Sequence, residues 1–434
     1  MNKKIKKYFL DTESSNVFKG MITLFVGAGF ARIIGLVSIP ILSRIYSPES
    51  YGVLAIYVSL VSVLAPIMTL RYVQAIPLPK RDLMAFNLLS VCFKLIILFS
   101  LILILILYIW GETILMRFNM EALIPWQWLI VLGVFGTALY ELLSSWATRK
   151  RQYKVIAKTQ ITQSLIGNLI KISLGLLAFK SSGMLIGQLV SQSAGVTSII
   201  KHCREDFKLY LTKVSLTKEK LVAKYYQDFV WFRLPSQFLM VISTQAPVIM
   251  MASLFDTNSV GQYGLAKMVL MVPSALIGQA VSRAFYAEIA RIGKSDFKKI
   301  KIITWDVQKK LIMVGAPIMI IFSTFAPWFF VVFFGNEWVV AGEYARILSP
   351  YILLILISTP LIQVLNIVGS QSVFLMINIT RALGLIFLFF LVDYFKLTAV
   401  DFIIVFSVFS SIYAVFQLVI VFYYVNRAAK LEPK

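Results

Sequence analysis

The chain has 434 residues, of which 59% are hydrophobic, and its mean hydropathy is +0.83. This composition excludes a soluble globular protein of this size and indicates an integral membrane protein with an all-α fold. Two cysteines and one histidine are too few for a disulfide framework or a metal site, and no P-loop, paired carboxylates or Ser–His arrangement indicates an enzyme. We therefore expect a non-enzymatic protein without a metal or a cofactor.

Apolar runs recur along the whole chain, and each reaches the roughly 20 residues that a helix needs to cross a bilayer. We expect about 12 transmembrane helices, with no room for a soluble domain between them. The expected spans cover residues 20–43, 51–72, 83–110, 124–147, 155–179, 182–201, 229–253, 259–283, 307–334, 344–368, 372–393 and 401–426.

The basic residues are distributed unevenly between the two sides of the membrane. With the N-terminus in the cytoplasm, most of the 42 Lys and Arg fall before the first span, after even-numbered spans or at the C-terminus. The positive-inside rule then places both termini in the cytoplasm. Basic loops facing anionic lipid account for the net charge of +22 without nucleic acid. The first apolar run is too long for a signal peptide and lacks a small-residue cleavage site, so we expect it to be retained.

Two sequence matches at nearly the same offset indicate an internal repeat. Ser50-Tyr51-Gly52 matches Ser259-Val260-Gly261 at an offset of 209 residues, and Asn168-Leu169-Ile170-Lys171 matches Asn378-Ile379-Thr380-Arg381 at 210. Because each copy holds six spans, both enter the membrane in the same direction, as in transporters built from parallel repeats around a central pathway. The expected organisation is an N-terminal lobe over 1–203, a cytoplasmic linker over 204–228 and a C-terminal lobe over 229–434.

Six basic residues lie at least four residues inside the ends of the expected spans, and only one carboxylate, Glu141, lies at comparable depth. A charge at the centre of a spanning helix costs about 2.5–3.5 kcal/mol on the insertion scale, so it normally faces a protein interior or a watery cavity. One glutamate cannot pair with six cations. We therefore expect a hydrated, cationic cavity for an anionic substrate, formed by Arg32, Lys171, Lys267 and Arg381, with Lys94 and Arg233 as weaker candidates.

Alternatives stay open for three of these residues. Arg233 is close enough to the cytoplasmic end of its span for the side chain to reach the surface. Lys94, on a helix rich in leucine and isoleucine, could instead contact a neighbouring element, or reach the lipid headgroups if the helix is shifted. Glu141 could be a proton or sodium site that couples transport, or the partner of a nearby lysine or arginine.

Polar and small side chains follow one face of the expected helix over 155–179, at the spacing of Gln160, Ser164, Asn168, Lys171 and Gly175. Neutral amides in the expected spans would add hydrogen-bonding groups that suit sugars: Asn168, Gln188, Gln192, Gln237 and Asn378. Hydrogen bonds between helices explain each of these amides equally well. A second stripe has four-residue spacing typical of close helix packing: Gly183, Gly187, Ser191 and Gly195.

Four segments of the sequence carry a family resemblance: Arg32-Ile33-Ile34-Gly35-Leu36, the run from Pro40 to Glu49, Tyr51-Gly52 and the basic segment from Arg149 to Tyr153. They resemble the bacterial polysaccharide-repeat-unit flippases, the O-antigen and capsule translocases of the multidrug/oligosaccharidyl-lipid/polysaccharide exporter superfamily. The resemblance implies two six-helix lobes in a MATE-like fold.

The resemblance also implies a function in lipopolysaccharide or capsule synthesis in the bacterial cytoplasmic (inner) membrane. Such proteins move an undecaprenyl-pyrophosphate-linked oligosaccharide to the outer leaflet by alternating access, beside polysaccharide polymerase and chain-length proteins. Two alternatives remain: a multidrug exporter of the same superfamily, and a membrane polysaccharide polymerase or ligase. Exporters of cationic drugs usually need acidic cavity residues, and the excess of six basic residues over one carboxylate in the spans speaks against that alternative. Polymerases and ligases usually carry a large outer loop, which this sequence lacks.

Overall fold

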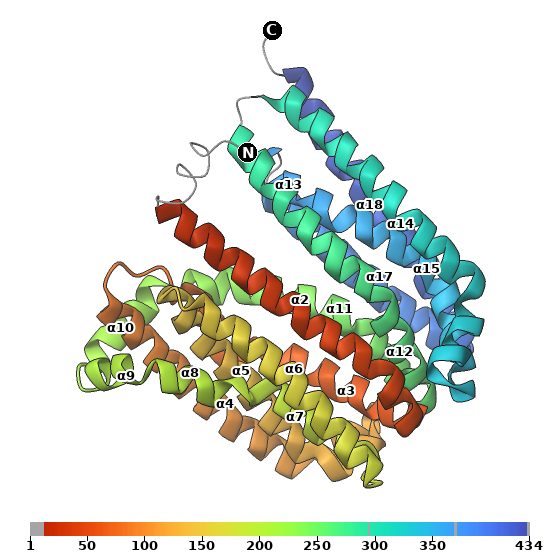
Figure 1. Ribbon diagram of the computed structural model, residues 1–434, viewed down its shortest axis with the longest axis horizontal. Helices are drawn as coiled ribbons and strands as arrows, with labels where there is room; N and C mark the ends of the chain where they lie inside the picture. The colour runs from red at the N-terminus through yellow and green to blue at the C-terminus, as the bar shows by residue number, and fades with distance from the viewer. Residues whose placement is uncertain (1–12, 294–295, 369–370, 432–434) are drawn as a thin grey trace, which may run out of the picture. The chain divides into compact units, whose positions relative to one another are not determined.

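The computed structural model describes residues 13–293, 296–368 and 371–431, and these residues form helices and short connections without a strand (Figure 1). The chain divides into two compact units, Met1–Val241 and Ile242–Lys434, which are described separately below. The division falls inside α11 (Leu234–Leu254), later than the residue 229 at which the second lobe was expected to begin. The expected linker therefore groups with the first unit.

The first unit is a bundle of long apolar helices followed by short linker helices (Figure 1). Within it α4 packs on α5, α6 packs on α2 and α7, and α10 lies along α4. Its elements before α11 are α2 (Glu13–Ile45), α3 (Pro48–Leu64), η1 (Ile67–Thr69), η2 (Tyr72–Ala75), α4 (Asp82–Arg117), η3 (Glu121–Trp126), α5 (Gln127–Arg149), α6 (Tyr153–Leu176), α7 (Lys180–Ser193), α8 (Gly195–His202), α9 (Arg204–Leu211), α10 (Leu216–Tyr225) and the π-helical turn η4 (Phe229–Arg233).

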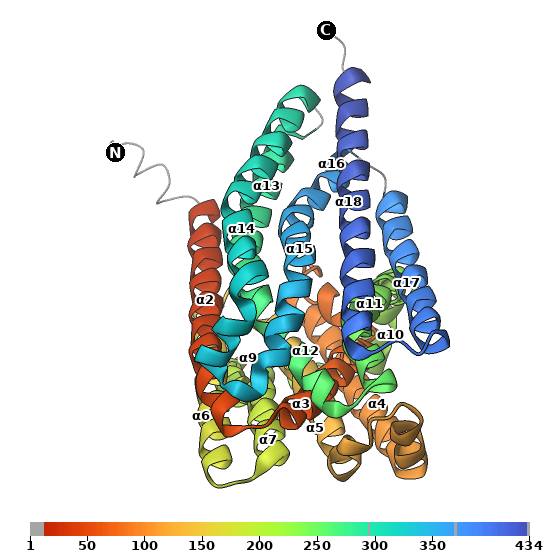
Figure 2. The ribbon, with the colours of Figure 1, turned by 90° about the vertical axis from the view of Figure 1, so that its right-hand side faces the viewer.

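The second unit is built around α15, which packs against α12, α14 and α18 (Figure 2). Its elements after α11 are α12 (Thr257–Pro273), the π-helical turn η5 (Ser274–Gly278), α13 (Gln279–Ile292), α14 (Phe297–Phe334), η6 (Asn336–Trp338), α15 (Val339–Leu361), η7 (Ile362–Val364), α16 (Leu365–Val368), α17 (Gln371–Tyr394) and α18 (Ala399–Leu431).

Ten helical segments in the described part of the chain are long and apolar enough to cross a membrane, so the protein is a multi-pass membrane protein. The other two expected spans correspond to α6 and α12, which do form helices. These two helices carry Lys171 and Lys267. The polar stripe lowers the hydropathy of α6, and α12 has only 17 residues. The two helices that fall short of the length or the composition of a spanning helix are thus two of those that carry candidate site cations.

The two copies of the repeat begin their second helix in the same way. The residue before α3, Ser47, has φ −68° and ψ 161°, and the residue before α12, Asp256, has φ −73° and ψ 161°. These N-caps are separated by the same 209 residues as the matched Ser50 and Ser259. Each helix then packs on the fourth long helix of its own copy, α3 on α5 and α12 on α15. Local geometry and packing thus agree with the sequence repeat.

The glycine stripe of α7 allows close contact with α6, as expected from its spacing. A methyl group added at Gly187 would lie 2.3 Å from Cγ of Lys171 and 2.9 Å from the carbonyl oxygen of Gly167 on α6. At Gly183 it would lie 2.5 Å from the hydroxyl of Tyr46. The packing role predicted for this stripe is confirmed.

Candidate functional site

Lys171 lies in the first unit with its amine enclosed between α6 and α7. The side chain is buried, and its Nζ donates to Oε1 of Gln188 on α7 at 2.7 Å. The hydroxyl of Tyr46, directly after α2, donates to the backbone oxygen of Lys171 at 2.7 Å. Two of the residues expected from the sequence, Lys171 and Gln188, are thus in contact. The oxygen that meets the amine belongs to a neutral amide, so the positive charge is solvated but not neutralised.

Other amides of the first unit connect helices. The side-chain oxygen of Gln192 accepts from the hydroxyl of Tyr57 at 3.3 Å. Asn168 donates to the backbone oxygen of Ser164 at 2.8 Å, and Ser164 donates to the backbone oxygen of Ala31 at 2.7 Å. The polar stripe of α6 therefore meets α2 next to Arg32, which is partly exposed. Gln237 lies on α11 and is also partly exposed.

Glu141 forms an ion pair with Arg71, whose Nη1 lies 3.0 Å from its Oε1. Arg71 stands at the end of the expected span over 51–72, where a basic residue is expected to face the cytoplasm, but the structure buries its side chain, which is 8% exposed. Arg71 has a φ of 62°, in the left-handed region that non-glycine residues seldom adopt. Glu141 was expected to be either a coupling site or the partner of a basic residue, and the structure shows that it has a basic partner, Arg71. No sequence pattern could indicate this partner, because Arg71 lies 70 residues from Glu141 in the chain.

Lys94 and Arg233, the weaker candidates for the cationic cavity, both contact side chains of the first unit. Nζ of Lys94 lies 2.7 Å from Oε2 of Glu219 on α10, and the Glu219 side chain is only 6% exposed. The exposed Arg233 donates through Nε to Oε1 of Gln74 at 3.2 Å. Lys94 thus contacts a neighbouring element, as its alternative interpretation requires.

A cluster of charges holds the linker against the ends of α4 and α5. Arg149 and Lys150 both contact Asp82 at 2.8 Å, and Lys150 also reaches Asp206 on α9 at 3.2 Å. Trp146 donates to the same Asp206 carboxylate at 3.2 Å. Partial burial lowers the pKa of Lys150, but its hydrogen bonds and charge interactions with Asp82 and Asp206 outweigh this, so the pKa lies above its ordinary value.

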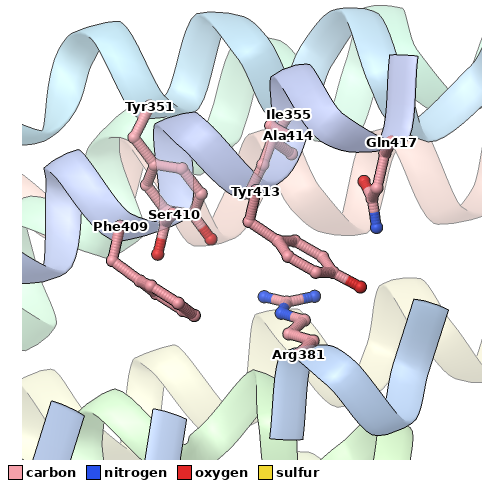
Figure 3. Close-up of a pocket in the computed structure, with 8 residues that line it drawn as sticks. All are labelled: Tyr351, Ile355, Arg381, Phe409, Ser410, Tyr413, Ala414 and Gln417. Carbon is pink, nitrogen blue, oxygen red and sulfur yellow. The ribbon is translucent and has the colours of Figure 1, made fainter. Parts of the chain in front are cut away.

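The second unit contains a small hollow, open on one side, beside Arg381 of α17 (Figure 3). The guanidinium carbon lies 5.9 Å from the ring centroid of Tyr413 on α18, and Figure 3 shows the guanidinium group turned toward that ring. The remaining lining residues come from α15 and α18: Tyr351, Ile355, Phe409, Ser410, Ala414 and Gln417. One cation thus faces an aromatic wall with hydroxyl and amide groups at its edges.

Hydrogen bonds and ring contacts fix the walls of this hollow. The Tyr351 hydroxyl is hydrogen-bonded to Ser410 and Arg381. The Tyr413 hydroxyl donates to the backbone oxygen of Ile377 on α17, and the Phe409 and Tyr413 rings stack with centroids 6.4 Å apart. The aromatic wall is therefore held in place on both sides of Arg381.

Lys267 of α12 does not line this hollow but interacts electrostatically with Arg381, and the two like charges repel. Its Nζ donates to the backbone oxygen of Thr244 at 3.3 Å and lies 5.9 Å from the ring centroid of Tyr263. No carboxylate of the described residues forms an ion pair with Lys267 or Arg381. Asn378 precedes Arg381 by three residues on α17 and is partly exposed. The structure thus brings together two of the expected cations in a region without acidic partners.

Sequence reasoning missed the polar wall of the hollow. Ser410, Tyr413 and Gln417 recur at i, i+3 and i+7 on the last helix, a spacing that places them on one face. That spacing was available as a signal. Tyr351 had none, because a tyrosine after a proline in an apolar run does not stand out.

The long apolar helices and the cations among them are those of a multi-pass membrane protein. The family described as "Polysaccharide biosynthesis protein" matches residues 41–343, more than half of the chain, and the chain belongs to this family. No match was found among proteins of curated function.

Solved structures with the same fold are transporters. A lipid II flippase, MurJ, in an inward closed conformation matches with a TM-score of 0.72 and 15% identity, covering 94% of this chain and 90% of that one. An inward-facing multidrug resistance MATE family transporter of the MOP superfamily matches with a TM-score of 0.68 and 15% identity, covering 95% and 96%. The eukaryotic MATE transporter AtDTX14 matches with a TM-score of 0.59 and 16% identity, covering 96% and 99%. The chain therefore has the MATE-like fold expected from its sequence.

Proposed function

We propose that the protein is a flippase that moves undecaprenyl-pyrophosphate-linked oligosaccharide units from the cytoplasmic to the outer leaflet by alternating access. The observation that carries the proposal is the presence of two like charges in the second unit, Arg381 lining an open hollow and Lys267 repelled by it, without an acidic partner among the described residues. Two like charges held close together in an apolar bundle are stabilised when an anion binds. A lipid-linked oligosaccharide supplies such an anion in its pyrophosphate and in any acidic sugar.

Family membership and fold support this choice of substrate. The family acts in polysaccharide biosynthesis, and one protein of the same fold is a flippase for lipid II. In this proposal the cations that meet the anionic groups are Arg32, Lys171, Lys267 and Arg381, and the amides that meet sugar hydroxyls are Asn168, Gln188, Gln192, Gln237 and Asn378. The protein acts in the bacterial cytoplasmic membrane with both termini in the cytoplasm, next to polymerase and chain-length proteins.

A multidrug exporter is the second candidate, because MATE transporters share the fold. A cationic drug would meet Lys267 and Arg381 and be repelled by both. Glu141, the acidic group best placed for such a drug, already pairs with Arg71. The charge of the described residues therefore favours an anionic substrate.

Substitution of the candidate cations tests the proposal. Arg32→Ala, Lys171→Ala and Arg381→Ala are expected to reduce surface polysaccharide while membrane insertion and expression stay normal. Arg427→Ala is the matched control, because it removes an exposed charge at the end of α18, outside the hollow. Wild-type polysaccharide in all three variants, at normal expression, would overturn the cationic pathway.

A further inference from the structure

We infer that the hollow beside Arg381 binds a carboxylate-bearing sugar residue, so that the oligosaccharide carried by this protein is acidic. The inference rests on the proposed function and specifies its substrate. The site is defined by Arg381 and by the α15 and α18 side chains around it, above all Tyr351, Ser410, Tyr413 and Gln417 (Figure 3).

The cation of the site suits a carboxylate. A guanidinium group presents a planar fork of N–H donors that matches the two oxygens of a carboxylate, and such charge-assisted pairs are stronger than neutral hydrogen bonds. Arg381 forms no ion pair with a described carboxylate, and Lys267 adds a second positive charge nearby. A neutral sugar would leave both charges uncompensated.

The walls of the site suit a sugar ring. The stacked rings of Phe409 and Tyr413 form an apolar platform beside the guanidinium, while Ser410 and Gln417 offer hydroxyl and amide groups. Binding sites of this kind combine mainly apolar and aromatic surfaces with a few polar groups that fix orientation. A pyrophosphate has no apolar face to lie on such rings, and burying its charge against them is costly. An acidic sugar could place its carboxylate against the Arg381 guanidinium and its ring against Phe409 and Tyr413.

Tight packing fixes the platform on the side of α17. A methyl group added at Gly384, one turn after Arg381, would lie 2.4 Å from Cζ of Phe409. The absence of a side chain at Gly384 therefore allows the Phe409 ring to lie against α17 next to the cation. In the first unit, the amine of Lys171 is instead enclosed by Gln188. Of these two cations, Arg381 is the one that lines an open hollow.

Direct binding to the purified full-length protein in detergent or nanodiscs tests the inference. The probes are glucuronate, its uncharged methyl ester and inorganic pyrophosphate, compared by saturation-transfer NMR and calorimetry. Loss of a charge-assisted pair corresponds to about a ten- to hundred-fold weaker affinity, so glucuronate should bind about that much more tightly than the ester. Arg381→Gln should abolish this preference, and Arg427→Gln, which removes an exposed charge elsewhere on α18, should leave it intact.

Arg381→Lys provides a second variant if Arg381→Gln does not fold. It keeps the positive charge but lacks the planar fork, so the preference for glucuronate should fall without disappearing. Equal binding of acid and ester by the wild-type protein would overturn the inference. Displacement of glucuronate by lower concentrations of pyrophosphate would also overturn it, and would assign the site to the lipid-linked phosphate.

The flippase proposal is judged separately, by the leaflet in which lipid-linked units accumulate when the gene is deleted. If these units accumulate in the cytoplasmic leaflet while acid and ester bind equally, the flippase proposal stands and the acidic-sugar inference fails. If no units accumulate there, the proposed function fails whatever the sugar preference of the hollow.

Discussion

The ion pair between Arg71 and Glu141 is expected to stabilise the first unit. The Arg71 side chain is 8% exposed and that of Glu141 is 38% exposed, so the pair lies between two known regimes. Fully exposed pairs contribute about 0.2–1 kcal/mol, whereas removing one partner of a fully buried pair costs about 3–5 kcal/mol. We therefore expect Glu141→Gln to reduce the free energy of unfolding by about 1.5–3 kcal/mol, mainly because the Arg71 guanidinium stays buried without its carboxylate.

A double-mutant cycle measures this pair directly. Arg71→Gln, Glu141→Gln and the double variant would be unfolded in mixed micelles with increasing sodium dodecyl sulfate, followed by helical circular dichroism. We expect a coupling energy of about 1–2 kcal/mol, because the second substitution removes a group that the first has already left unpaired. The exposed pair of Arg346 and Glu343, with its atoms 3.8 Å apart, is the control and should show almost no coupling. Additive effects at Arg71 and Glu141 would refute the reasoning and reopen a coupling role for the glutamate.

Three further predictions concern contacts of the first unit. Glu219→Gln should release α10 from Lys94 and speed limited proteolysis of the linker about two- to five-fold, and exchanging the two charges in a Lys94→Glu, Glu219→Lys variant should restore protection. Gly187→Ala should destabilise the protein by about 1–3 kcal/mol, because the new methyl group meets Lys171 and the backbone of α6. Cys203 should resist a polar maleimide at neutral pH and react once the protein is unfolded, because burial, followed by the charge of Asp206, raises the pKa of its thiol to about 11.

Each of these predictions has its own control and contrary outcome. The linker prediction fails if Glu219→Gln is cleaved at the wild-type rate. For Gly187, the control is Gly29→Ala on α2, where an added methyl group meets nothing within 4 Å, and equal stability of the two variants would contradict the packing argument. For Cys203, Cys92→Ala isolates the signal, since Cys92 is also buried. Rapid labelling of the folded Cys92→Ala protein would show that the linker does not cover Cys203.

Hydrophobic patterning predicted the helical architecture because apolar runs of sufficient length have few alternatives in a bilayer. It did not predict where helices break. The expected span over 259–283 is interrupted after Pro273 by the π-helical turn η5, and the span over 182–201 is divided into α7 and α8 at Ala194. These breaks depend on local backbone geometry and on packing with neighbours, which hydropathy does not encode.

The candidate cations were visible in the sequence because isolated charges stand out in apolar helices. Their partners were not, since the partners are distant in the chain. Arg71 lies 70 residues from Glu141, and Lys94 lies 125 residues from Glu219. Tyr351 was also missed, because tyrosines are common in apolar helices and only the fold brings this one to Arg381.

The leaflet in which lipid-linked oligosaccharides accumulate tests the central claim most directly. In a strain that lacks the gene, complete but unpolymerised units would be probed in intact spheroplasts with a membrane-impermeant reagent that reacts with sugars, before and after permeabilisation. The flippase account predicts that the units accumulate and react only after permeabilisation, and that the wild-type gene reverses this. Units that react in intact spheroplasts would lie in the outer leaflet, which would contradict a flippase and indicate a polymerase or ligase.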